Sequence, residues 1–205
     1  MVIVFNDYFT FVFTEEDTSH FPPSAEYTNI KCTDVKFTVA DVNDKLAKLR
    51  PDKAADPDNL LPRFLLEITD FITYTLFLLF RKSLDENIVP ADWNCANISP
   101  IYKKGNRNKA DNYRPISLTS QICKIFESII RDTVVKHIKD NLLISDSQHG
   151  FRRGRSCLTN LLTFLDKVKS YVDTGDDVDA VFLDFAKAFD KVPYMRLTKI
   201  EKSWY

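Results

Sequence analysis

A carboxylate near the end of an alternating apolar stretch is the first feature of this sequence that suggests chemistry. Residues 178–185, VDAVFLDF, alternate with period two, which predicts a mostly buried β-strand with Asp184 on the same face as Val178 and Phe182. A carboxylate buried among apolar side chains needs a compensating cation. Hard divalent ions such as Mg²⁺ take oxygen ligands, so Asp184 is a candidate metal ligand. The alternative is a strand that ends in a helix-capping aspartate.

A cluster of basic residues around a predicted turn at Gly105 and Asn106 is a second candidate site. Arginine can bind an anionic group as a planar bidentate fork, and lysine can bind it as a point charge. By charge alone, the cluster also fits a solvated basic hairpin. The six basic residues are Lys103, Lys104, Arg107, Lys109, Arg114 and Lys124.

The loop at residues 148–155 concentrates positive charge in a third place. Its glycines permit close backbone approach, and its arginines suit contacts with nucleic-acid phosphates. His149, in the same loop, is interpreted as a packing residue rather than a general base or metal ligand. The candidate binding residues of this loop are Gln148, Gly150, Arg152, Arg153 and Arg155.

Helical and strand periodicities predict the elements that position these residues. Thr38 and Asp41 approximate a capping box for a helix over residues 38–50. Residues 60–86 are predicted to form one long, largely buried helix, and Ser156 is predicted to cap a leucine-rich helix. His137 is expected on the surface. Further predictions are a strand over 96–102, a helix over 119–140 and a turn at 175–177.

Composition favours a folded chain of one domain, or one and a half. The 205 residues are 44% hydrophobic and 13% aromatic, which predicts a packed core. The net charge is −1, so any nucleic-acid site must come from local clusters. None of the four cysteines forms a C-x-x-C pair, and residues 71–80, the longest apolar run, are too short to span a bilayer. A soluble intracellular chain with reduced thiols is therefore expected.

Four sequence blocks occur in an order that resembles a known family. They are K-A-x-x-P-D, K-K-G followed by N-Y-R-P-I-S-L, Q-H-G-F-R-x-G-R-S, and F-L-D-F-x-K-A-F-D. Together they resemble reverse transcriptases of non-LTR (LINE-type) retrotransposons, close to the jockey-like elements. The resemblance implies an α+β fold, helix-rich with a short antiparallel sheet. It divides the chain into a connecting region (1–37), fingers with helical palm support (38–177), and the start of an incomplete palm (178–205).

The resemblance also implies an RNA-directed DNA polymerase that extends a DNA primer on an RNA template, using deoxynucleoside triphosphates and two Mg²⁺ or Mn²⁺ ions. Asp184 and the backbone carbonyl of Phe185 would then bind metal, and Phe189 would crowd the 2′-hydroxyl of a ribonucleotide. Either Lys103 or Lys104, together with Arg114, would hold the triphosphate, and the loop at 148–155 would bind template or primer. By the same analogy, the chain would act in the nucleus.

The family's second carboxylate strand, typically F/Y-A-D-D, does not occur in these residues. We therefore expect an incomplete two-metal site and no activity from this chain alone. Two alternatives remain open. A non-catalytic remnant would bind RNA or DNA in a salt-dependent way, and a functionless relic would unfold without cooperativity.

Overall fold

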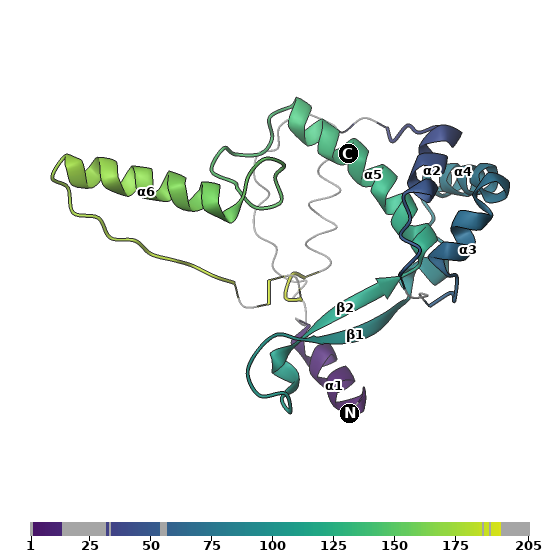
Figure 1. The fold of residues 1–205 in the computed structure, drawn as a ribbon, viewed down its shortest axis with the longest axis horizontal. Coiled ribbons are helices and arrows are strands. Elements are labelled where there is room, and N and C mark those ends of the chain that lie inside the picture. The colour runs from purple at the N-terminus through teal and green to yellow at the C-terminus, as the bar shows by residue number, and fades with distance from the viewer. Residues whose placement is uncertain are drawn as a thin grey trace, which may run out of the picture.

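The structure is a computed structural model that describes residues 2–13, 32, 34–53, 57–185, 187–188 and 190–193. This part of the chain is helix-rich and contains one two-stranded antiparallel sheet, as predicted (Figure 1). No helix within it is long and apolar enough to cross a membrane. The elements are α1 (Val2–Val12), α2 (Val39–Ala47), α3 (Pro62–Glu67), α4 (Thr69–Glu86), η1 (Ala91–Asn94), β1 (Ala96–Tyr102), η2 (Ala110–Asn112), β2 (Tyr113–Thr119), α5 (Gln121–Asp140) and α6 (Cys157–Asp173).

The hydrophobic core lies where α2, α4 and α5 meet. Phe80 of α4 is fully buried and stacks on Phe126 of α5 at a centroid distance of 5.0 Å. The predicted capping box between Thr38 and Asp41 begins α2 and is confirmed. The buried core residues are Phe37, Val42, Leu46, Leu76, Phe80, Ile125, Phe126 and Ile129.

The prediction of one long, largely buried helix over residues 60–86 is wrong. The helix breaks at Ile68, whose φ of −102° and ψ of 12° depart from helical values. The hydroxyl of Thr69 also donates a hydrogen bond to the carbonyl of Leu65. Only one face of α4 packs on α2 and α5, so Phe71 on another face is 83% exposed.

The C-terminal end of α5 departs from a second expectation. His137 is buried there rather than on the surface. The side chain of Asn141 folds back over the last turn, with its amide nitrogen 3.3 Å from His137 Nδ1. The same amide donates a hydrogen bond to the His137 carbonyl. The side chain of Asn141, just beyond α5, therefore covers the ring of His137. Helical spacing alone had placed this ring outside the apolar stripe of the helix.

The strands β1 and β2 form the predicted hairpin, and β1 matches the expected residues 96–102. The register pairs Ile101 with Arg114 and Tyr102 with Tyr113. Gly105 in the connecting loop has a φ of +92°, and a Cβ there would lie 2.9 Å from the side chain of Asn112. Glycine is therefore required both by conformation and by space.

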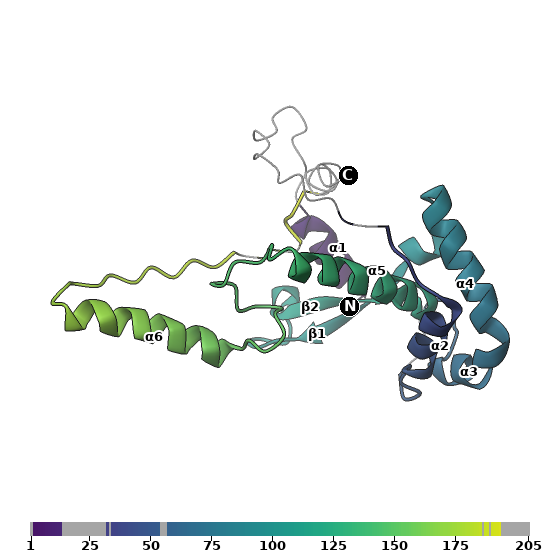
Figure 2. The same ribbon diagram turned by 90° about the horizontal axis from the view of Figure 1, so that it is seen from above.

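The helix α6 projects away from the rest of the described structure (Figures 1 and 2). The predicted cap at Ser156 is confirmed, because Ser156 and Thr159 form a capping box. Gly175 adopts a φ of +86° in the predicted turn, and the chain then continues as an extended segment. In Figure 1, this segment leads back from the far end of α6 toward the hairpin.

The prediction of a buried strand over residues 178–185 is wrong. Phe182 is 81% exposed and Leu183 is 89% exposed, and within the described residues the sheet contains only β1 and β2. A strand is stable when its backbone N–H and C=O groups pair with a neighbour and its apolar faces are covered. The alternating pattern marks a segment suited to a sheet, but the described residues give it no strand to pair with.

Candidate functional site

A pocket of about 300 Å³ lies between α1, the hairpin and three residues near the end of the described chain, Lys187, Ala188 and Asp190. Figure 1 shows α1 beside the turn end of the hairpin, and Phe5 packs edge-on against Tyr113 at a centroid distance of 4.7 Å. The pocket combines three basic residues with one carboxylate and three aromatic rings. Its lining residues are Tyr8, Phe9, Val12, Lys103, Tyr113, Arg114, Pro115, Ile116, Lys187, Ala188 and Asp190.

The hairpin brings two of the predicted phosphate-binding residues to this pocket. The Lys103 N–H donates a hydrogen bond of 2.8 Å to the carbonyl of Asn112, so hairpin pairing continues beyond β1. Arg114 is on the opposite strand, paired with Ile101. Within the described part of the chain, neither Lys103 nor Arg114 forms an ion pair. Their charges therefore remain available for an anion. Lys104, the other lysine considered from sequence, does not line the pocket.

Lys187 is a further cation of this pocket, and sequence reasoning missed it. Lys187 Nζ donates a hydrogen bond to the Tyr8 hydroxyl and lies 4.3 Å from the centroid of that ring. The available signal for Lys187 was its place between Asp184 and Asp190 in the F-L-D-F-x-K-A-F-D block. Tyr8 gave no such signal, because 179 positions separate the two residues in the chain.

The structure does not bring Asp184 into this pocket. Asp184 lies in the exposed segment before it, while Asp190 is the acidic residue that lines the pocket. Phe185 is also exposed, and Phe189 lies outside the described residues. Among the residues that are described, no group of three or more His, Cys, Asp or Glu side chains is placed to hold a metal ion. These residues therefore do not assemble the expected metal site.

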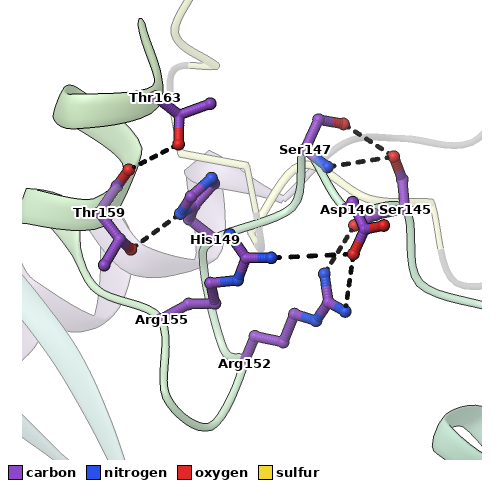
Figure 3. Close-up of polar contacts among 8 residues, drawn as sticks. All are labelled: Ser145, Asp146, Ser147, His149, Arg152, Arg155, Thr159 and Thr163. Carbon is purple, nitrogen blue, oxygen red and sulfur yellow. Dashed lines mark hydrogen bonds and ion pairs between the residues drawn. The ribbon is translucent and has the colours of Figure 1, made fainter. Parts of the chain in front are cut away.

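The arginine-rich loop is organised around Asp146 (Figure 3). Arg152 donates hydrogen bonds to Asp146 Oδ1 at 3.2 Å and to the Ser145 carbonyl at 3.0 Å. Arg155 lies 3.8 Å from the same carboxylate oxygen. Arg153 is exposed and forms no ion pair with any described residue. Two of the three predicted arginines thus shape the loop, and the third presents its charge to solvent.

His149 fastens this loop to the start of α6. Its ring is buried, and Nδ1 lies 2.9 Å from the Thr159 hydroxyl, which also takes part in the capping box of α6 (Figure 3). The interpretation of His149 as a packing residue is confirmed. Gln148 Nε2 donates a hydrogen bond of 3.3 Å to the Gly150 carbonyl, so the side-chain amide of Gln148 stabilises the backbone of the loop. No neighbouring atom approaches the position of a Cβ at Gly150.

An exposed aromatic residue in the same loop was also missed from sequence. Phe151 is fully exposed and has a φ of 56°, a left-handed conformation that is uncommon for a bulky side chain. In sequence, Phe151 directly precedes Arg152 and Arg153. The exposure of Phe151 could not be predicted from the sequence, because phenylalanine is usually buried.

Comparison with known proteins gives a consistent result. Residues 101–203 match the family described as reverse transcriptase (RNA-dependent DNA polymerase). The chain is 27% identical over 155 residues to a probable RNA-directed DNA polymerase from transposon BS of Drosophila melanogaster, covering 75% of this chain and 17% of that protein. It is 30% identical over 156 residues to the RNA-directed DNA polymerase from mobile element jockey of Drosophila melanogaster, covering 76% and 17%.

A third relative agrees with the other two. The probable RNA-directed DNA polymerase from transposon X-element of Drosophila melanogaster is 26% identical over 162 residues, which cover 78% of this chain and 18% of that protein. The chain thus spans about a sixth of the length of these curated relatives. The matched region contains the hairpin residue Arg114, the loop at 148–155 and the segment that carries Asp184.

Proposed function

This chain belongs to the reverse transcriptase (RNA-dependent DNA polymerase) family, and from that membership we propose that it supplies the nucleotide- and template-binding part of an RNA-directed DNA polymerase. The observation that carries the proposal is that Lys103 and Arg114 line one pocket and that neither forms an ion pair with a carboxylate among the described residues. In this proposal, residues 38–177 act as fingers and helical palm support. Residues from 178 onward begin the palm.

The ligand of the pocket is the triphosphate of an incoming deoxynucleotide. Lys103 and Arg114 come from opposite strands of one hairpin, so their separation is held by backbone hydrogen bonds rather than by flexible loops. A guanidinium binds two phosphate oxygens in a fixed geometry, and an ammonium adds a point charge. The aromatic rings of Tyr8, Phe9 and Tyr113 give the same pocket an apolar side suited to a sugar or base.

Equilibrium titration with fluorescently labelled dTTP in the presence of Mg²⁺ tests this assignment. A hydrogen bond to a charged group contributes about 1.5–3 kcal/mol, so Arg114→Gln should weaken binding at least about tenfold. Lys109→Gln is the matched control, since Lys109 is an exposed cation of the same hairpin that does not line the pocket. Equal affinity of the Arg114→Gln and Lys109→Gln variants would overturn the assignment.

The loop at residues 148–155 is proposed to contact the phosphates and bases of the template or primer. Arg153 supplies the phosphate contact, because Arg152 and Arg155 are already held by Asp146. The exposed ring of Phe151 offers a surface on which a base can stack, a contact that contributes about 1–3 kcal/mol in single-strand binding proteins. Gln148 and Gly150 shape the backbone that presents these two side chains.

Fluorescence anisotropy with an RNA template annealed to a DNA primer tests the loop. Arg153→Gln should reduce the slope of log affinity against log salt by about one, whereas Lys167→Gln on the exposed face of α6 should leave it unchanged. Phe151→Asn should weaken binding at every salt concentration, and asparagine tolerates the left-handed backbone. Unchanged slopes in Arg153→Gln would remove this loop from the interface.

Asp184 is proposed to contribute one carboxylate, with the Phe185 carbonyl, to a Mg²⁺ site of the polymerase. Among the described residues, Asp184 belongs to no group of three or more His, Cys, Asp or Glu side chains placed to hold a metal ion, so we assign no catalytic step through a metal to this chain. We expect it, by itself, to bind nucleic acid without extending a primer. The exposed and unpaired segment 178–185 is the observation that favours this non-catalytic reading of the isolated chain.

Primer extension on an RNA template with Mg²⁺, using the chain beside its Asp184→Asn variant, tests the catalytic part. The expected result is no extension by either protein. Extension that disappears in Asp184→Asn would show that the chain is active and that Asp184 takes part, which contradicts the expected inactivity. Extension that persists in the variant would also remove Asp184 from the proposed metal site.

A further inference from the structure

The N-terminal helix α1 forms one wall of the pocket. Phe5 packs against Tyr113 on the hairpin, and Tyr8, Phe9 and Val12 line the cavity itself. Tyr113 in turn packs edge-on against Tyr102 at 5.6 Å, so the helix is anchored on an aromatic cluster of the hairpin. From this anchor, Tyr8 reaches Lys187, which comes from the far end of the described chain. The helix therefore joins the two other walls of the site.

Lys187 lines this pocket, and no carboxylate among the described residues forms an ion pair with it. Its ammonium group donates a hydrogen bond to the hydroxyl of Tyr8. Asp190 lines the same pocket without forming an ion pair with Lys187. With Lys103 and Arg114, Lys187 makes three cations around a cavity that holds one carboxylate. Such an excess of unpaired positive charge favours a ligand with several negative charges.

We propose that Lys187 is a third phosphate-binding cation of this pocket and that Tyr8 is its positioning residue. This inference rests on the proposed function, in which the pocket receives the triphosphate of a deoxynucleotide. The Tyr8 hydroxyl accepts a hydrogen bond from Lys187, and its own proton remains available for a phosphate oxygen. Tyr8 thus holds the ammonium toward the pocket without neutralising it.

A lysine in this position needs such support because its side chain has four flexible carbon–carbon bonds. An unrestrained ammonium at the pocket entrance would lose conformational freedom each time it bound a phosphate. The contact with α1 imposes that restriction before the ligand arrives. Residues 2–13 are therefore part of the binding site and not merely a connection to it.

The test is the affinity of the purified chain for dTTP and dTMP in the presence of Mg²⁺. Lys187→Met should weaken dTTP binding about tenfold and dTMP binding less, because the monophosphate carries fewer charges. Lys167→Met on α6 is the matched control for loss of an exposed lysine, and Phe11→Leu is the control for a change on the exposed face of α1. Both controls should match the unmodified chain.

The role of Tyr8 is separated from a purely structural role by a double-mutant cycle. Tyr8→Phe keeps the ring but removes the hydroxyl, and it should weaken dTTP binding about threefold when Lys187 is present. In the Lys187→Met background, the same change should have no effect. Equal effects of Tyr8→Phe in both backgrounds would overturn the positioning role.

The remaining outcomes distinguish this inference from the function on which it rests. Loss of dTTP binding in Arg114→Gln together with normal binding in Lys187→Met would overturn the role of Lys187 and leave the proposed pocket intact. Absence of dTTP binding by the unmodified chain would overturn both. Circular dichroism of each variant identifies any that do not fold, and Lys187→Arg, which keeps the charge, should then retain dTTP binding where Lys187→Met does not.

Discussion

Replacing Phe80 with alanine should remove much of the stability of the described core. The Phe80 ring is fully buried, stacks on Phe126 at 5.0 Å and meets the edge of Trp93 at 5.9 Å. Truncating a buried phenylalanine costs about 3–5 kcal/mol, and each aromatic pair contributes about 0.5–1.5 kcal/mol of that beyond simple area burial. With two close aromatic partners, Phe80→Ala should lie in the upper part of this range.

Urea unfolding followed by far-ultraviolet circular dichroism and by tryptophan fluorescence measures the loss. Coincident transitions in the unmodified chain would establish cooperative unfolding, which a relic without a defined fold would not show. Phe71→Ala is the matched control, because Phe71 is on the same helix but is 83% exposed, and its loss should stay within about 0.5 kcal/mol.

Two results would refute this reasoning. A loss below about 1 kcal/mol in Phe80→Ala would mean that the core does not depend on this ring. A comparable loss in Phe71→Ala would mean that α4 is covered on the face described as exposed. If Phe80→Ala does not fold, Phe80→Leu, which retains part of the side chain, should give a smaller and measurable loss.

Three further measurements follow from the structure. The hydroxyl and backbone N–H of Thr38 donate hydrogen bonds to the Asp41 carboxylate and hold its pKa below the ordinary value. The stability that these hydrogen bonds contribute is therefore complete above about pH 4 and is lost as the pH falls through the pKa of Asp41 in the folded chain. Between pH 5 and pH 3 the free energy of unfolding should therefore fall less in Asp41→Asn than in the unmodified chain, and equal falls would contradict the capping role. Burial raises the pKa of the Cys123 thiol to about 11. At pH 8 a thiol reagent should therefore modify the exposed Cys157 quickly and Cys123 only after unfolding, and comparable modification rates at the two cysteines would contradict the burial of Cys123. Brief chymotrypsin digestion should cleave within residues 181–185 before it cleaves within the core helices α2, α4 and α5, and an earlier cut in one of these helices would contradict the exposure described here.

Sequence alone determined the features that depend on neighbours a few positions away. The capping boxes at Thr38 and Ser156 were predictable, because the bonded groups are three residues apart. The strand predicted over residues 96–102 is confirmed with the same bounds. Asn59 adopts a φ of 56°, in keeping with the tolerance of asparagine for left-handed geometry.

The same local information placed the candidate binding residues in the right elements. Arg114 is in a hairpin strand, and Arg153 is in the loop before α6. What the pattern left open was which of two adjacent lysines turns toward the pocket. Register and the continued pairing of Lys103 with Asn112 decided this in favour of Lys103, because neighbouring residues of an extended chain point to opposite sides.

Tertiary structure alone decided the contacts between distant parts of the chain. The hydrogen bond between Tyr8 and Lys187 joins residues 179 positions apart. Asp146 forms ion pairs with Arg152 and Arg155, whereas Arg153 is exposed to solvent. The alternation in residues 178–185 indicated a buried strand, yet the segment is exposed among the described residues. The physical reason is that periodicity records which faces of a segment are apolar, whereas burial and ion pairing depend on what another segment places against those faces.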